Sequence, residues 1–371
     1  MNLSYWEYNT WLSKVDFTIV GSGIVGLNCA LSLREKFPKA KILILEKGQL
    51  PQGASTKNAG FACFGSLSEI LDDLETHSEE EVFYLVKKRY EGLKLLISTL
   101  GEKEIDYQML GGYELFLKSQ QELYETCFSK IEDVNALLKP IFKDSTFKIY
   151  NNKFKFQNIV PNYVFSPFEG SIDTGKMMLS LLKLAIKKDI LLLNSVEVKS
   201  FSELAKCVHV KTSNFEFKTN KLLIATNGFA SQLLNVNVKP ARAQVLITEP
   251  IENLHIKGTF HLDKGYYYFR NVNNRILFGG GRNLDFNAEE TTEFGLTNLV
   301  QGKLETILDE VILPEKKVKV TQKWSGIMGV GDQKKAIVKE VSNHVFCGVR
   351  LGGMGVAIGS LIGKELADLV E

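Results

Sequence analysis

Short apolar runs and a helix-period segment alternate at the start of the chain. Phe17–Val20 is an almost unbroken apolar run, and Ile42–Leu45 is a second one. The first run predicts a buried parallel strand, because a strand that is covered on both faces shows no polar alternation. Between the runs, Leu27–Leu33 has helical spacing. The pattern therefore predicts a strand, a helix and a second strand over residues 15–46.

Three glycines occupy the predicted turn between the first strand and the helix. Gly21 allows a tight turn, Gly23 lets the backbone approach a pyrophosphate, and Gly26 lets the helix press against the strand. The helix N-terminus then offers N–H groups and partial positive charge to phosphates. Glu46 ends the second strand, where a carboxylate accepts hydrogen bonds from ribose hydroxyls. This order of features predicts dinucleotide binding; an ordinary glycine-rich turn is the alternative.

The period of the apolar pattern changes several times farther along the chain. The Gly53–Phe61 loop of small and hydrogen-bonding residues suits a longer cofactor, and a surface loop is the alternative. Helical patterns cover 67–100, 120–138 (ended by Pro140), 175–188, 287–310 and the C-terminus to Val370. Strand patterns cover 111–117, 190–193, 196–201, 208–212, 215–218, 222–225, 242–249, 266–271, 275–279, 318–328, 336–339 and 344–347. Residues 1–14 form an aromatic arm that we expect to pack across a sheet edge.

Composition narrows the class of protein. The 371 residues are 44% hydrophobic and 24% charged, as in an ordinary globular protein. A net charge of +2 predicts no nucleic-acid partner. The five cysteines have no CxxC spacing, so we expect neither a disulfide framework nor a metal site, and a cytoplasmic location. We read no signal peptide and no transmembrane segment.

A second glycine loop, Gly352 to Gly355, precedes the last predicted helix. A helix N-terminus there would face the pyrimidine end of a flavin, where the reduced ring holds negative charge. Arg350 precedes this loop and would strengthen the effect or neutralise a substrate carboxylate. The alternative is that these glycines only permit close packing of helix and sheet.

These motifs, in this order, resemble those of the FAD-dependent D-amino-acid-oxidase-like superfamily. The motifs are the triplet with Glu46, Gly53–Phe61, Glu169–Thr174, Ala225–Gly228, Arg242–Val245, Tyr268–Gly281 and Gly352–Gly355. The nearest branch contains the sarcosine, glycine and γ-glutamylputrescine oxidases. The resemblance implies oxidation of a C–N bond of a small amine or amino acid, with hydride passing to flavin N5 and electrons then passing to O₂ or another acceptor.

The fold class that follows is α/β (α+β overall). We predict a discontinuous Rossmann-like FAD-binding domain over 1–80, 165–235 and 325–371. A substrate domain, built on a mostly antiparallel sheet plus helices, would cover 81–164 and 236–324.

The resemblance also assigns residues to the cofactor. Those expected to bind FAD are Gly21, Gly23, Ile24, Val25, Gly26, Glu46, Lys47, Ala54, Ser55, Thr56, Asn58, Ala59, Gly60, Val198, Thr226, Asn227, Gly228, Gly352, Gly353, Met354, Gly355 and Val356. Some relatives attach FAD covalently through a cysteine near Trp324–Gly329 or a histidine near Lys57-Asn58. This chain has neither, and Cys63 lies past Gly60, so we predict non-covalent FAD.

The catalytic candidates are Tyr268, Arg270 and Arg350. Tyr266, Tyr268 and Arg270 share one face of an alternating strand, and arginine beside aromatic rings suits a carboxylate. The alternative is a solvated arginine with core-packed tyrosines. Arg242 and Arg282 are weaker candidates.

Other residue types give fewer indications. The five histidines show no metal spacing, and His261 is the one that merits a test. Relatives place an arginine near Ile327-Met328 and an oxygen-activating lysine near Ile276–Phe278, and this chain has neither. A dehydrogenase therefore fits as well as an oxidase. Other functions left open are a 2-hydroxy-acid dehydrogenase, a tRNA-modifying flavoenzyme and a non-catalytic flavin-binding protein.

Overall fold

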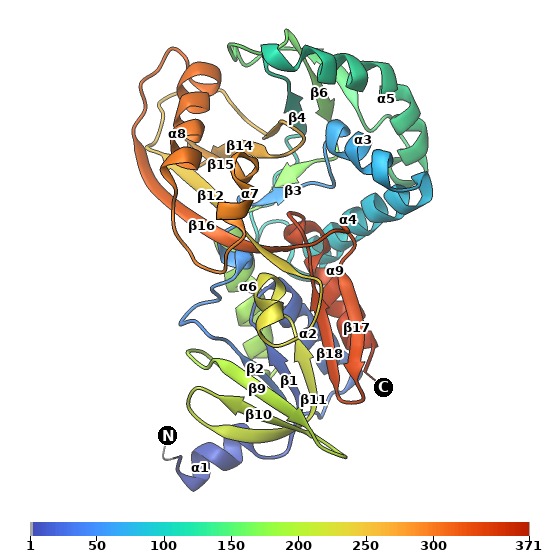
Figure 1. Ribbon diagram of the computed structural model, residues 1–371, viewed down its shortest axis with the longest axis vertical. Coiled ribbons are helices and arrows are strands. Elements are labelled where there is room, and N and C mark those ends of the chain that lie inside the picture. The colour runs from blue at the N-terminus through green and yellow to red at the C-terminus, as the bar shows by residue number, and fades with distance from the viewer. Residues whose placement is uncertain (1–2, 371) are drawn as a thin grey trace.

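The computed structural model describes residues 3–370 and shows two lobes, each built on a sheet (Figure 1). The sheet of the lower lobe contains β1 (Val15–Val20), β2 (Ile42–Leu45), β8 (Leu191–Leu193), β9 (Val198–Glu203), β10 (Val208–Thr212), β11 (Glu216–Ile224), β17 (Ile337–Ser342) and β18 (Val345–Val349). The sheet of the upper lobe contains β4 (Gly112–Leu115), β5 (Lys148–Asn151), β6 (Asn162–Ser166), β12 (Lys239–Thr248), β13 (Thr259–Leu262), β14 (Tyr267–Val272), β15 (Arg275–Gly280) and β16 (Val320–Val330). A small third sheet pairs β3 (Phe61–Ala62) with β7 (Gly170–Ser171).

Helices cover both sheets and the junction between the lobes. They are α1 (Tyr5–Glu7), α2 (Ile24–Lys36), α3 (Leu67–Thr76), α4 (Glu79–Leu100), α5 (Gln121–Phe142), α6 (Thr174–Lys187), α7 (Phe286–Glu289), α8 (Asn298–Ile307) and α9 (Gly355–Asp368). Short 3₁₀ or π turns cover Tyr8–Leu12, Ala54–Thr56, Lys118–Gln120, Asn227–Gln232, Arg282–Leu284 and Leu308–Ile312. None of the helices described within residues 3–370 has both the length and the apolar character that crossing a membrane requires.

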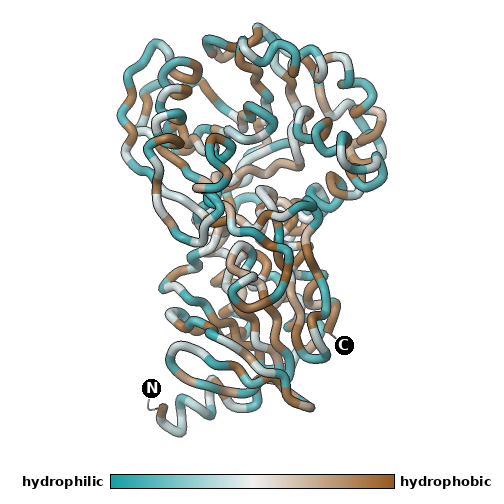
Figure 2. Tube along the Cα trace, viewed as in Figure 1, coloured by the Kyte–Doolittle hydropathy of each residue, from teal (hydrophilic) through white to brown (hydrophobic). Residues whose placement is uncertain are grey.

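The lower sheet is parallel at its centre. β1 lies between β2 and β11, and β18 continues the parallel order beyond β11. In Figure 2, apolar stretches follow the strands of this lobe, in agreement with strands whose side chains are buried on both faces. The carboxyl ends of β1, β2, β11 and β18 therefore meet at one edge, which faces the upper lobe.

The upper sheet is mostly antiparallel and has an aromatic core. β12 pairs with β15 and β16, and β14 pairs with β13 and β15, all antiparallel, whereas β13 and β4 are parallel. The rings of Phe260 and Phe269 stack with centroids 4.5 Å apart, and Tyr113 stacks on Phe260 at 5.1 Å. Offset aromatic packing of this kind stabilises a sheet face beyond the area it buries.

Most predicted elements are present, but four details of the sequence analysis were wrong. The patterns at 215–218 and 222–225 belong to the single strand β11. Pro140 does not end α5 but lies inside its last turn, although proline is unfavourable within a helix. The helix continues to Phe142, whose buried ring packs 4.5 Å from that of Phe64. The left-handed Lys143 ends the helix instead.

The other two errors have side-chain causes. The helix expected over 287–310 is interrupted between α7 and α8, because buried Glu289 accepts hydrogen bonds from Arg242 and Gln244 and holds the chain there. Residues 5–12 do not pack their aromatic rings across a sheet edge. A capping box between Ser4 and Glu7 starts α1, and Trp6 is left 73% exposed.

Two helical glycines give a test of the packing at the junction. A Cβ at Gly92 of α4 would lie 2.3 Å from the carbonyl oxygen of Ala357 in α9, whereas a Cβ at Gly302 of α8 would meet no atom within 4 Å. We expect Gly92→Ala to lower the free energy of unfolding by about 1–3 kcal/mol through overpacking. Gly302→Ala should raise it by about 0.5–1 kcal/mol through helix propensity. Chemical denaturation of both variants measures this, and equal effects would contradict the close crossing of α4 and α9.

Candidate functional site

A cavity of about 920 Å³ lies between the two lobes. Its lower walls come from the start of α2, the end of β2, the 53–60 loop and the loop after β11. Its upper walls come from β12, β14 and β16, and the 350–356 loop closes it. Ligands of open parallel sheets bind beyond the carboxyl ends of the strands, and this cavity occupies that position.

The glycine turn after β1 shapes the start of the cavity. Gly21 has a φ of +102°, which favours glycine, and a Cβ at Gly26 would lie 1.9 Å from the carbonyl oxygen of Gly21. Gly23 lines the cavity, and a Cβ there would lie 2.8 Å from Ser55 Oγ. That hydroxyl also accepts a hydrogen bond from the Ile24 N–H at 3.0 Å. The three glycines therefore have the three roles expected: a turn, an open backbone surface and close packing.

The Glu46 carboxylate organises two turns beside the cavity. Its Oε2 accepts hydrogen bonds from the Ser22 N–H at 3.0 Å and the Ser22 hydroxyl at 2.8 Å. Its Oε1 accepts from the N–H groups of Gly48 at 3.0 Å and Gln52 at 3.4 Å. Glu46 is buried and lines the cavity, so its position agrees with the proposed contact to a ribose.

The 53–60 loop is held by Asn58. Its amide group donates to the carbonyl oxygens of Ala54 and Ser55, and its Oδ1 accepts from the Gly60 N–H and the Thr174 hydroxyl. This internal bonding gives the loop a fixed shape without a regular element.

The 350–356 loop leaves open space at two of its glycines. Gly352 has a φ of +59°, and a Cβ at Gly352 or Gly353 would meet no protein atom within 4 Å. Both residues line the cavity, so the lack of side chains here leaves room for a ligand rather than for the sheet. The alternative interpretation of tight helix–sheet packing does not apply at these two positions. The Leu351 N–H donates to Asn227 Oδ1 at 3.1 Å, which joins this loop to the one after β11.

Most of the predicted cofactor residues line this cavity. They are Gly21, Gly23, Ile24, Val25, Glu46, Lys47, Ala54, Ser55, Asn58, Ala59, Gly60, Val198, Thr226, Asn227, Gly352, Gly353, Met354, Gly355 and Val356. Gly26, Thr56 and Gly228 do not line it. The Thr56 hydroxyl donates to the carbonyl oxygen of Pro51, and a Cβ at Gly228 would lie 2.5 Å from the carbonyl oxygen of Met328. The cavity thus brings together most of the residues that we expect to hold FAD.

Two of the three catalytic candidates are engaged by the backbone. Arg270 does not line the cavity, because its guanidinium is buried and donates to the carbonyl oxygens of Ala59 at 2.5 Å and Ile172 at 2.7 Å. Burial lowers the pKa of Arg270 to about 10. Arg350 lines the cavity but donates to the carbonyl oxygens of Lys335 and Asn237. Both side chains therefore connect distant segments of the backbone. We had expected them to contact the substrate instead.

Tyr268, the third catalytic candidate, lines the cavity on the side of the upper sheet, and so does Arg282, a weaker candidate from the sequence. Burial raises the pKa of Tyr268 to about 12, so its phenol is neutral at physiological pH. Arg282 lies over the rings of Tyr266 at 5.6 Å and Phe286 at 5.1 Å. Among the arginines that line the cavity within residues 3–370, it is the one without a hydrogen bond to a protein acceptor. In the sequence, the one feature that could have singled out Arg282 was its position directly after three glycines.

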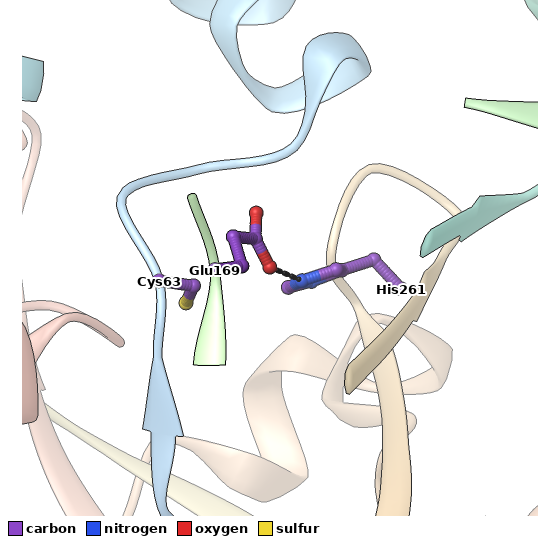
Figure 3. A group of neighbouring side chains, drawn as sticks. All are labelled: Cys63, Glu169 and His261. Atoms are coloured by element: carbon purple, nitrogen blue, oxygen red, sulfur yellow. Dashed lines mark hydrogen bonds and ion pairs between the residues drawn. The ribbon is translucent and has the colours of Figure 1, made fainter. Parts of the chain in front are cut away.

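A buried polar cluster lies at the same side (Figure 3). His261 Nε2 and Glu169 Oε2 are 2.8 Å apart, and the donor atoms of Cys63, Glu169 and His261 lie within 4.8 Å of one another. Burial raises the pKa of the Cys63 thiol well above its ordinary value. Because the histidine and the carboxylate already bond each other and the thiol stays protonated, we interpret the cluster as an ion pair beside a neutral thiol.

Sequence reasoning singled out His261 but missed its partner Glu169. The two residues are far apart in the chain, and Glu169 carried a signal only as part of the segment before α6. Cys63 was considered only as a point of flavin attachment. No local pattern indicated that these three residues would meet.

Comparison with known proteins gives concordant results. A family model described as FAD dependent oxidoreductase (DAO) matches residues 16–369. The chain is 20% identical over 383 residues to the probable oxidoreductase OrdL of Haemophilus influenzae, covering 97% of this chain and 84% of that protein.

Two solved structures share the fold. They are glycine oxidase from Geobacillus kaustophilus (TM-score 0.79, 17% identity, 96% of this chain and 94% of that one) and iminodiacetate oxidase from Chelativorans sp. BNC1 (TM-score 0.77, 18% identity, 95% of each chain). This likeness confirms the predicted fold class.

The four hydrogen bonds to Glu46 give a test of the cofactor site. We expect Glu46→Gln to weaken FAD binding about 10- to 100-fold, because one carboxylate oxygen becomes an NH₂ group that faces backbone N–H donors. Titration of the apoprotein with FAD, followed by flavin fluorescence, measures the effect. Glu132→Gln on the exposed face of α5 is the matched control and should change nothing. Unchanged affinity in both variants would contradict the role of Glu46.

Proposed function

The chain belongs to the family of FAD-dependent oxidoreductases, and from this premise we propose that it oxidises the C–N bond of a small amino acid or a related amine. The family assignment confirms the resemblance read from the sequence and FAD as the cofactor. The glycine and iminodiacetate oxidases that share the fold act, by their names, on compounds that carry both nitrogen and carboxylate. These names support the proposed substrate class.

The observation that carries the proposal is the guanidinium of Arg282, which has no hydrogen-bond acceptor among residues 3–370. A guanidinium that lines a cavity without a protein acceptor offers paired donors to a carboxylate. Arg270 was the sequence candidate for this role, but it does not line the cavity, and its Nε and Nη2 donate to the carbonyl oxygens of Ala59 and Ile172. We therefore transfer the proposed carboxylate contact from Arg270 to Arg282.

The neighbouring side chains would position the rest of a small substrate. Tyr266 and Tyr268 line the cavity beside Arg282, and neighbouring residues of the wall, such as Val245, are apolar. Bound FAD supplies a ring that accepts hydride from the substrate carbon. The protein then has to orient that carbon, exclude water and keep the amine neutral.

The electron acceptor is O₂ or another molecule. Residues 276–278 of β15, where a lysine would assist the reaction with O₂, are the buried apolar residues Ile276, Leu277 and Phe278. Without that lysine, we propose a dehydrogenase and an oxidase as equal candidates. We retain non-covalent FAD as a prediction, which acid precipitation tests by releasing the flavin.

Anaerobic reduction of the bound flavin tests the proposed function. The FAD-loaded protein is mixed with glycine, sarcosine, iminodiacetate, methylamine and lactate, and the flavin absorbance at about 450 nm is followed. We expect an amino compound that carries a carboxylate to reduce the flavin. Reduction by lactate alone would indicate a 2-hydroxy-acid dehydrogenase, and reduction by none would indicate a different function.

A substitution at Arg282 tests the carboxylate contact. We expect Arg282→Gln to raise the concentration of glycine or sarcosine needed for half-maximal reduction rate about 10- to 100-fold, because a charge-assisted hydrogen bond is lost. Reduction by methylamine, which has no carboxylate, should be affected much less. Arg275→Gln is the matched control, since Arg275 lies on β15 outside the cavity and donates to the carbonyl oxygen of Thr248. A loss of equal size for both compounds would contradict the contact.

A further inference from the structure

His261 lies in the cavity wall, and one of its two ring nitrogens is hydrogen-bonded to a buried carboxylate. It lies on β13, and its Nε2 is 2.8 Å from Oε2 of Glu169 (Figure 3). The Thr259 hydroxyl donates to the same oxygen at 3.2 Å. His261 is 4% exposed and Glu169 is 1% exposed. The pair is therefore shielded from bulk water and fixed in orientation.

This arrangement decides where His261 can exchange a proton. A carboxylate acceptor keeps the hydrogen on Nε2, so the second proton of the imidazolium is carried by Nδ1. Within residues 3–370 no hydrogen bond to Nδ1 is present, and His261 lines the cavity. The arrangement of a histidine with one nitrogen held by a carboxylate and the other free is that of a general base.

We propose that His261, held by Glu169, is the acid–base residue of this enzyme and accepts the proton that the substrate ammonium loses. The inference rests on the proposed oxidation of an amine. In the step, an N–H bond of the ammonium breaks, its electron pair stays on nitrogen, and an Nδ1–H bond forms. The substrate thereby becomes the neutral amine that donates hydride. The proton later leaves Nδ1 to water in the cavity.

The charges around His261 favour its protonated form. Burial alone lowers the pKa of His261, but the attraction and hydrogen bond of Glu169, with Glu69 and Glu114 farther away, more than offset this and raise the pKa to about 9. Cys63, directly after β3, stays a neutral thiol. Tyr268, opposite His261 on β14, stays a neutral phenol.

The buried Glu114 is held separately. It accepts hydrogen bonds from the hydroxyls of Ser66 and Ser68 and from the Ser68 N–H at 3.1 Å. Burial raises the pKa of Glu114. Glu169 is therefore the one carboxylate in direct contact with the imidazole among the described residues, and it sets the orientation of the ring.

A base of this strength suits an ammonium group. Ammonium groups have pKa values of about 8–10, so proton transfer to a histidine with a similar pKa costs little free energy. Below pH 9 most of His261 already carries the second proton. The rate of flavin reduction should therefore rise about tenfold per pH unit up to about pH 9 and level off above it.

Histidine NMR tests the pair without any substrate. The FAD-loaded protein, labelled with ¹⁵N-histidine, is titrated with base, and His261→Asn identifies the signal. We expect that signal to titrate near pH 9 and to move down by about one pH unit or more in Glu169→Gln, because the opposite charge is removed. Titration near pH 6.5 in both proteins would overturn the pair.

Kinetics of the same variants test the proton transfer. With glycine or sarcosine under anaerobic conditions, His261→Asn should slow flavin reduction about 10²- to 10⁴-fold at pH 8. His255→Asn is the matched control, since His255 bonds the Phe154 carbonyl oxygen outside the cavity, and should react at the wild-type rate. In Glu169→Gln the rise with pH should move to lower pH. If the rise of the reduction rate with pH came from ionisation of the substrate itself, it would occur at the same pH in Glu169→Gln as in wild type.

Several outcomes would overturn the proposal and separate it from the proposed function. A His261→Asn variant that reacts like wild type contradicts the acid–base role. Metal analysis gives a second test: one metal ion per wild-type protein that is lost in Cys63→Ser would show that the cluster is a metal site, and this also contradicts the role. FAD content and thermal melting show whether each variant folds, and His261→Gln replaces His261→Asn if it does not. If wild-type protein binds FAD but no amine reduces it, the proposed function fails. The NMR titration then still decides whether Glu169 controls the ionisation of His261.

Discussion

The close approach of α2 to the turn that precedes it is the constraint on which the site depends. A side chain at Gly26 would overlap the carbonyl oxygen of Gly21, so only glycine lets α2 start directly beyond β1. α9 packs on α2 with a similar requirement, because a Cβ at Gly363 would lie 2.6 Å from the carbonyl oxygen of Val25. Two helices that come from opposite ends of the chain thus begin at the same edge of one sheet. Their N-termini concentrate partial positive charge at the cavity, where we propose that the phosphates and the ring of FAD bind.

The two lobes are joined by polar side chains that also shape the cavity. Arg270 reaches from the upper sheet to the carbonyl oxygens of Ala59 and Ile172, and the Trp324 indole N–H donates to the carbonyl oxygen of Lys57 at 3.0 Å. A second connection is the ion pair between buried Asp73 of α3 and Lys334 of the loop after β16. The contacts of Arg270 and Trp324 hold the 53–60 loop against the upper sheet. The arginine most suited by sequence to bind substrate is thus part of the joint between the lobes.

The upper-sheet wall of the cavity carries three kinds of polar group: a cation, a neutral hydroxyl and a histidine–carboxylate pair. Arg282 offers a cation that lies over aromatic rings, and Tyr268 offers a neutral hydroxyl. The His261–Glu169 pair is where we propose that a proton is accepted, and the neighbouring Cys63 thiol and Tyr268 phenol stay neutral. An amino acid carries a carboxylate and an ammonium group on the same carbon, and the proposed roles of Arg282 and His261 correspond to these two groups.

What the sequence determined was the part encoded by local rules. Glycine spacing, the acidic end of β2 and the order of strands and helices identified the nucleotide half, because each depends on backbone conformation within a few residues. The contacts of Arg270, Arg282 and Glu169 were decided only by the tertiary structure. A guanidinium binds whichever acceptor lies nearest, and for Arg270 these are carbonyl oxygens from segments about 100 and 200 residues away in the chain. His261 likewise meets Glu169 only in the folded chain, because the two residues are 92 positions apart and periodicity along the chain does not record such a contact.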